Sequence, residues 1–199
     1  MKLLREMKRH IQRMYGKRPL NNKHYTRIIN KKHFDRLKHL LENTKVFHGG
    51  RVSQANLSIE PTIVTDIGWE DPLMQEEIFG PILPVMAYNN LDDVIFTIQA
   101  KDKPLALYYF GSDKKNEERV MRSIPFGGGC VNDTLYHLAS PHLPFGGVGT
   151  SGIGSYHGKY SFETFSHRKS ILKQSTFIDN PIRYPGGKVK QSIAKNFLM

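Results

Sequence analysis

The segment from Met74 to Pro81 carries side chains that could do chemistry. It reads MQEEIFGP, two adjacent carboxylates followed by an aromatic ring and a Gly-Pro turn. Adjacent side chains on a strand or turn point to opposite sides, so Glu77 and Phe79 should share one side and Glu76 the other. A carboxylate and a ring that project together suit a ligand with hydroxyl groups and a flat ring. A sugar-containing aromatic cofactor is one candidate, and a simple salt bridge is equally compatible.

A second segment, PFGGVGTSGIG, is rich enough in glycine to suggest a nucleotide loop. A dinucleotide-binding loop needs a strand before it and a helix after it. Here Pro144 interrupts the approach, and the following YHGKYSFETF has no helical periodicity. The pattern therefore favours a structural loop beside a site.

Cys130 is the single cysteine, so the chain cannot form an internal disulfide. It lies in a strand-like GGCVND segment with no neighbouring base in sequence, which predicts a small buried apolar residue rather than a nucleophile. His157 could line a pocket or be a structural histidine, and both interpretations stay open. No histidine spacing typical of metal ligands occurs, so we predict no metal site.

The elements that position these residues follow from periodicity. Apolar residues at helical spacing predict helices over 3–15, 31–42, 91–100 and 114–124, and β-branched runs predict strands within 59–67, 82–88 and 105–111. This alternation predicts an α/β fold with a parallel sheet and crossover helices. The apolar run 105–111 predicts a strand covered on both faces, and alternation over 160–172 predicts a further strand. The first helix has no start signal, which suggests that Met1 is not the natural beginning of the domain.

The formal net charge of +11 is concentrated in one quarter of the chain. Residues 1–50 hold 14 Lys and Arg against three carboxylates, whereas residues 51–199 hold 15 of each sign. Few aromatic residues are interleaved for base stacking, so a solvated face is favoured over a nucleic-acid interface. No stretch is apolar enough for a membrane span, and one cysteine suits a reducing compartment. A cytoplasmic protein is the expectation.

Several motifs in fixed order resemble the aldehyde dehydrogenase superfamily, specifically the class 3 branch that includes fatty aldehyde dehydrogenase. They are RIINKKHFDRL, MQEEIFGPILPV, KPLALYYF, GGGCVNDT, LPFGGVGTSGIGSYHGKYSFETFSHRKSIL and a late RYP. The resemblance extends from about residue 5 to about residue 187.

The resemblance implies oxidation of medium- to long-chain aliphatic or aromatic aldehydes with NAD or NADP. It implies that Glu77 binds the hydroxyls of the nicotinamide ribose and that Phe79 packs near the nicotinamide, with Glu76 left as a structural partner. The expected wall of the aldehyde pocket consists of Leu135, Leu138, Ala139, Phe145 and His157.

The resemblance also implies a domain organisation. Residues 1–156 would be an incomplete catalytic domain, and 157–199 a bridging strand and tail that form a homodimer or a heterodimer with a full-length relative. The family's nucleophilic cysteine, its general-base glutamate, its oxyanion-stabilising asparagine and its dinucleotide-binding domain would all lie upstream of this chain. We therefore expect the chain alone to be inactive. The alternative is a non-catalytic interaction partner of a full-length aldehyde dehydrogenase.

Overall fold

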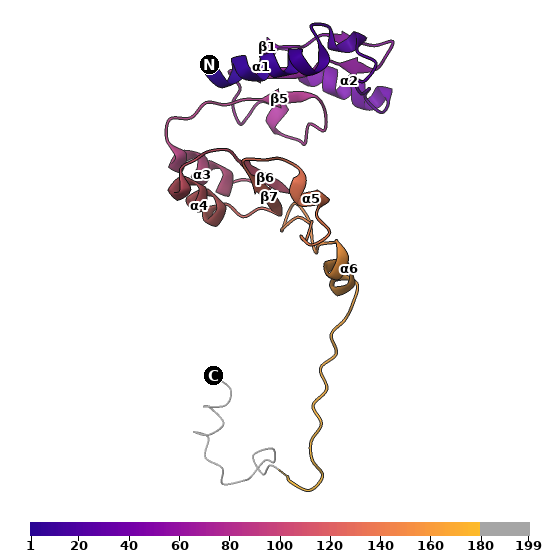
Figure 1. The fold of residues 1–199 in the computed structure, drawn as a ribbon, viewed down its shortest axis with the longest axis vertical. Coiled ribbons are helices and arrows are strands. Elements are labelled where there is room, and N and C mark those ends of the chain that lie inside the picture. Colours follow the sequence, from indigo (N-terminus) through magenta and orange to yellow (C-terminus); the bar gives the residue numbers. More distant parts are fainter. Residues whose placement is uncertain (180–199) are drawn as a thin grey trace. The chain divides into compact units, whose positions relative to one another are not determined.

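The computed structural model describes residues 1–179, and the late RYP motif lies outside them. The chain divides into two compact units, each described here by itself: the first is Met1–Val94 and the second begins at Ile95 (Figure 1). The boundary expected at residue 157, between a catalytic domain and a tail, is a different division and stays a prediction.

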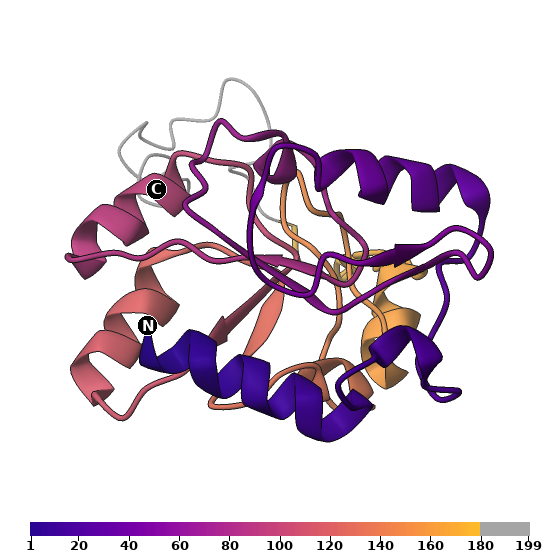
Figure 2. The ribbon, with the colours of Figure 1, turned by 90° about the horizontal axis from the view of Figure 1, so that it is seen from above.

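Two helices of the first unit lie where the sequence predicts them, with their ends within two residues of the predicted ones. α1 spans Lys2–Tyr15 and runs unbroken from the N-terminus (Figure 2), ending at Gly16, whose φ of 82° lies in the region that glycine tolerates. α2 spans Lys31–Leu40 and is capped by Asn30, whose side chain accepts a hydrogen bond from the His33 amide. Two short 3-10 helices, Pro19–Asn21 and Pro72–Met74, also belong to this unit.

The main sheet of the first unit has the strand order β1-β4-β5. Its strands are β1 (Lys45–His48), β4 (Thr62–Thr65) and β5 (Ile82–Pro84). β4 and β5 are parallel, as predicted, whereas β1 is an antiparallel neighbour of β4 that the sequence did not predict. β2 (Val52–Ser53) and β3 (Ser58–Ile59) form a separate antiparallel pair.

The core of the first unit lies between α2 and these strands. The apolar face of α2 contributes Phe34, Leu37 and Leu40, which are at most 7% exposed. They pack with the buried side chains Ile59, Val64, Leu73 and Ile82. Helical spacing on α2 therefore produces the contact face on which the unit depends.

The second unit contains a strand-helix-strand arrangement. β6 (Ala106–Tyr109) and β7 (Gly128–Val131) are parallel, and α4 (Lys114–Ser123) connects them. α4 is capped by Asp113, whose carboxylate accepts from the amides of the second and third helical residues. α3 (Leu91–Gln99) precedes β6, and the short helices α5 (Tyr136–Ala139) and α6 (Gly158–Thr164) follow β7. The two parallel pairs belong to separate sheets within the described residues.

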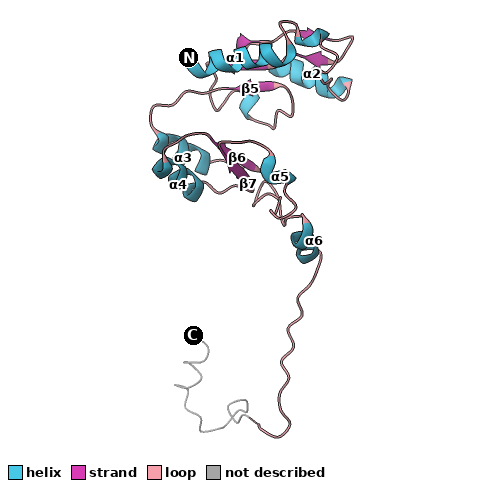
Figure 3. Ribbon diagram, in the orientation of Figure 1, coloured by secondary structure: helices cyan, strands magenta, loops and turns pink. Residues whose placement is uncertain are grey.

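Two sequence predictions are wrong in this unit. β6 is only half-buried along its length rather than covered on both faces. Residues 160–164, predicted to open a strand, belong to α6, and 166–175 are in neither a helix nor a strand, as the loop colouring of Figure 3 shows. The helix is favoured locally because the Ser161 hydroxyl accepts the His157 amide at 3.0 Å and the Thr164 hydroxyl donates to the Ser155 carbonyl at 2.6 Å. Strand pairing of 166–175 with a second chain stays a prediction.

We predict that Leu37→Ala lowers the free energy of unfolding by about 2–5 kcal/mol, because a fully buried side chain leaves a cavity in the core. Ile29, 86% exposed, supplies the matched control, and Ile29→Ala should change stability by less than about 0.5 kcal/mol. Urea denaturation followed by circular dichroism measures both. Equal effects would contradict the assigned core.

Candidate functional site

Arg36 of α2 fixes the segment that contains the two adjacent carboxylates. Its guanidinium donates to the Glu76 carboxylate at 2.8 Å, to the Ile78 carbonyl at 2.6 Å and to the Glu77 carbonyl at 3.4 Å. Arg36 thus binds two backbone carbonyls and one side chain of a segment about forty residues away. The expectation that Glu76 is a structural partner is confirmed, because its carboxylate is paired with Arg36.

The side chains of Glu77 and Phe79 are exposed to solvent rather than packed into the core. The Glu77 side chain is exposed, and its carboxylate has no hydrogen bond or ion pair to any residue from 1 to 179. Phe79 is 84% exposed, and its φ of 46° is uncommon for a residue with a bulky side chain. A free carboxylate and a free ring two residues apart can bind a polar and a flat group of one ligand, as the sequence suggested.

Gly80 brings this segment close to the core. A Cβ built at Gly80 would lie 2.7 Å from both terminal methyl carbons of Leu37, which is fully buried. The backbone can therefore lie against α2 only because this residue has no side chain. Arg36 and Leu37 together hold the segment from two consecutive positions of one helix.

Aromatic rings gather around Phe145 in the second unit. The centroid of Phe145 lies 5.7 Å from His137, 5.6 Å from Tyr156 and 6.3 Å from His157. Two reciprocal backbone hydrogen bonds of 3.0 Å join Phe145 to Tyr156 and fix the ring's position. His157 is oriented further by its Nδ1, which lies 3.1 Å from the Leu143 carbonyl. The structure therefore brings together two of the five predicted wall residues, Phe145 and His157.

The other three predicted wall residues lie at the short helix α5. Leu135 precedes the helix with a φ of 65°, and it is 59% exposed. Leu138 and Ala139 are also exposed. His137 anchors this helix, because it is 6% exposed and packs against Phe145. The exposed apolar side chains of α5 are thus attached to the aromatic cluster by a buried histidine.

Cys130 of β7 lies beside the same histidine. Its Sγ is 3.6 Å from His137 Nδ1, and the residue is half-buried. No base near this thiol is apparent from the sequence, so this imidazole is a finding of the structure. The Nε2 atom of His137 is buried without a hydrogen-bond partner. Gly128 faces the same ring, since a Cβ there would lie 3.0 Å from His137 Cδ2.

The glycine-rich segment folds on itself. A Cβ at Gly146 would lie 2.2 Å from the Gly154 carbonyl, and one at Gly147 would lie 2.1 Å from the Ser151 carbonyl. Such distances are impossible for a side chain, so these glycines allow close backbone approach. A cavity of about 250 Å³ lies beside this loop, and Phe145 is the one predicted wall residue that lines it.

Within residues 1–179 no group of three or more His, Cys, Asp or Glu side chains could hold a metal ion. Over the same range, the helices are too short or too polar to cross a bilayer.

The sequence model of the aldehyde dehydrogenase family matches residues 1–171. The chain belongs to the aldehyde dehydrogenase family. Aldehyde dehydrogenase family 3 member H1 of Arabidopsis thaliana is 46% identical over 188 residues, which cover 92% of this chain and 39% of that protein. The 4,4'-diaponeurosporen-aldehyde dehydrogenase of Staphylococcus aureus is 43% identical, over 98% of this chain and 43% of that protein.

The fold agrees with this membership. The substrate-bound structure of Staphylococcus aureus AldH has a TM-score of 0.87 and 42% sequence identity, and the match covers 100% of this chain and 44% of that one. The chain therefore spans about two fifths of the length of these aldehyde dehydrogenase relatives.

Sequence reasoning missed Arg36 and His137. Arg36 belongs to a helix whose basic residues were interpreted as a solvated face, and nothing in the pattern distinguishes the one that binds a distant turn. His137 was dismissed because it lacks metal-ligand spacing. His137 follows Asn132-Asp133 closely in the sequence, but only the structure shows that it belongs to a short helix.

We predict that Arg36→Met lowers the free energy of unfolding by about 1–3 kcal/mol, because the Ile78 carbonyl loses a charged donor. Glu76→Gln removes only a half-exposed ion pair and should cost less than about 1 kcal/mol. Chemical denaturation compares the two variants. A larger loss from Glu76→Gln would show that the ion pair, rather than the carbonyl contacts, holds the segment.

Proposed function

We propose that this chain is the part of a class 3 aldehyde dehydrogenase that holds the nicotinamide end of NAD or NADP and forms one wall of the aldehyde pocket. The reaction is oxidation of a medium- to long-chain aliphatic or aromatic aldehyde to the carboxylic acid. The observation that supports it most strongly is the presentation of Glu77 and Phe79 by an anchored segment in a chain of this family.

The residues fit the nicotinamide riboside chemically. The Glu77 carboxylate is ready to accept hydrogen bonds from the two ribose hydroxyls, and it has no internal partner to give up within residues 1–179. Phe79 offers an exposed ring for packing near the flat nicotinamide. When bound, the cofactor accepts the hydride from the substrate. The role of this chain is to orient it, since neither a carboxylate that accepts hydrogen bonds nor a phenyl ring transfers electrons.

The second unit suits the apolar end of an aldehyde. Phe145 is held by backbone hydrogen bonds and by rings on three sides, so it is a rigid surface. Leu135 and Leu138 are exposed, at the N-cap of α5 and within it. His137 of the same helix packs against Phe145. A wall of this composition favours hydrocarbon or aromatic substrates over small polar aldehydes.

Covalent catalysis in this reaction requires a thiol that attacks the aldehyde carbon. Cys130 is the single cysteine of the sequence and lies in strand β7, and the resemblance to class 3 enzymes implies that it is not the family's nucleophile. We therefore infer that the nucleophile is supplied by other residues of the active enzyme. A second candidate function, a non-catalytic partner of a full-length aldehyde dehydrogenase, is supported by exposed apolar side chains near the end of the described chain: Phe165, Ile171, Leu172 and Phe177.

We predict that the 199-residue chain alone forms no NADH or NADPH from aldehydes, because it lacks the nucleophile. Joining it to the amino-terminal part of the Arabidopsis family 3 relative, which would carry that cysteine, should restore aldehyde-dependent NAD(P)H formation. Absorbance at the nicotinamide band measures both. Turnover by the chain alone would contradict the assignment of Cys130.

In the joined enzyme, we predict that Glu77→Gln lowers kcat/KM at least about tenfold, as expected for loss of charged hydrogen bonds worth about 1.5–3 kcal/mol. The adjacent Glu76→Gln, whose partner is Arg36, is the matched control and should stay within about threefold. Equal losses from both variants would argue against a cofactor role for Glu77. If the joined enzyme is inactive while the chain binds a full-length relative during gel filtration, the partner function is favoured.

A further inference from the structure

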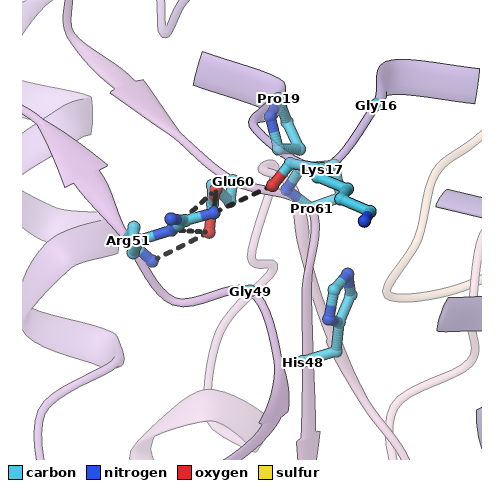
Figure 4. A pocket seen from close by; sticks show the side chains of 8 residues that line it. All are labelled: Gly16, Lys17, Pro19, His48, Gly49, Arg51, Glu60 and Pro61. Carbon is cyan, nitrogen blue, oxygen red and sulfur yellow. Dashed lines mark hydrogen bonds and ion pairs between the residues drawn. The ribbon is translucent and has the colours of Figure 1, made fainter. Parts of the chain in front are cut away.

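A separate pocket lies in the first unit, between the turn after α1 and the ends of the strands (Figure 4). Its volume is about 220 Å³, and Pro19 and Pro61 contribute rigid walls. Pockets that hold larger organic ligands usually range from roughly 300 to 1,000 Å³, so this one suits a small ligand. None of the residues assigned above to the aldehyde dehydrogenase reaction lines it.

The acidic side chain of the pocket already has a counterion, Arg51. Glu60 is 2% exposed, and its two carboxylate oxygens each lie 3.0 Å from Arg51 Nε, with Arg51 Nη2 2.7 Å from one of them. The same guanidinium donates to the Lys17 carbonyl at 3.2 Å and so ties the turn after α1 to the pocket. Hydrogen bonds to this carboxylate raise the pKa of Arg51, so the guanidinium stays charged.

Two basic side chains of the pocket have no such counterion. Among the described residues, neither the Lys17 ammonium nor the His48 ring has a hydrogen bond or ion pair, and Figure 4 shows the His48 ring pointing toward Lys17. Burial lowers the pKa of His48, and the nearby charges of Lys8 and Arg51 lower it further against the opposing effect of Glu60. The Lys17 ammonium and the His48 ring therefore line the same small pocket, and the charges of Lys8 and Arg51 act on His48.

We propose that this pocket binds a small tetrahedral oxyanion, phosphate or a soluble phosphate monoester, between Lys17 and His48. A compact ammonium is a common phosphate-binding group, and an imidazole can donate a hydrogen bond to an anionic oxygen. The Arg51–Glu60 pair supports the site, because Arg51 also binds the Lys17 carbonyl and so joins the turn after α1 to Glu60. The basic excess of residues 1–50 attracts anions toward this end of the chain.

Binding is linked to protonation of His48. In the free chain burial and, after it, the neighbouring cations favour the neutral ring, so the His48 pKa is lowered and the proton is lost at a lower pH than for an ordinary histidine. A bound anion favours the imidazolium instead, and binding therefore takes up a proton. Affinity should increase as pH falls and decrease as pH rises through the pKa of the anion-bound state.

Sulfate is the probe for this linkage, because phosphate itself changes charge with a second pKa near about 6. Calorimetric titration of the full chain at constant ionic strength should show affinity at least about tenfold higher at pH 5.5 than at pH 7.5, a difference equal to one pKa unit of linkage. His48→Gln should remove this dependence. The proton resonances of the His48 ring should shift with sulfate in the unsubstituted chain, which tests the site without any variant.

Lys17→Met should weaken sulfate binding at least about fivefold, whereas Lys23→Met, an exposed lysine outside the pocket, should change it less than about twofold. Equal effects of the two substitutions, or absence of saturable binding at either pH, would overturn the proposal. Glycerol phosphate should bind like sulfate at low pH. Binding confined to vesicles that contain phosphatidic acid would overturn the assignment to a soluble ligand.

Discussion

The contact between Arg36 and the backbone of residues 76–78 is the constraint on which the site in the first unit depends. The helix that carries Arg36 is held by its buried apolar face, of which Leu37 is part, so the guanidinium starts from a fixed position. Its donors hold the carbonyls of Glu77 and Ile78, and Gly80 lets the following backbone lie against Leu37. As a result, contacts with α2 fix the segment that carries the exposed Glu77 carboxylate and Phe79 ring, although neither side chain is part of the core. Presentation of binding groups by a rigid element is what ligand orientation requires.

The second unit also holds side chains of its candidate site in fixed positions, but through glycine-rich backbone and ring contacts. The loop around residue 147 folds tightly because it has glycine at positions where a side chain would collide with a backbone carbonyl. The rings of Phe145 and Tyr156, on either side of this loop in the sequence, are in contact. The central residue is Phe145, because His137, Tyr156 and His157 all contact it. A buried histidine then connects the exposed end of α5 to this cluster. Both units belong to the part of the chain that the aldehyde dehydrogenase family model matches, and each is described from its own contacts.

Long periodic segments were predictable from sequence, and long-range contacts were not. The helices near 3–15, 31–42 and 114–124 follow from apolar spacing, and the structure shows the caps Asn30 and Asp113 on the latter two. The antiparallel strand β1 reads KVFH, and its single β-branched residue, Val46, gives no clear strand pattern. Residues 160–164 of α6 were predicted as part of a strand because their polarity alternates, and the hydrogen bonds to Ser155 and from His157 that favour the helix are not visible in that pattern. Of the candidate site, Glu77, Phe79, Phe145 and His157 came from motifs, but no local pattern could reveal a guanidinium some forty residues away.

The central claim is that Glu77 and Phe79 orient the nicotinamide riboside. A crystal structure of the joined enzyme with NAD bound tests it most directly. Our account predicts that a Glu77 carboxylate oxygen lies about 2.5–3.0 Å from a hydroxyl of the nicotinamide ribose, the usual range for O–H···O hydrogen bonds, with the Phe79 ring against or beside the nicotinamide. A ribose bonded to other residues, with Glu77 directed into solvent and Arg36 still on the carbonyls of residues 77 and 78, would contradict it.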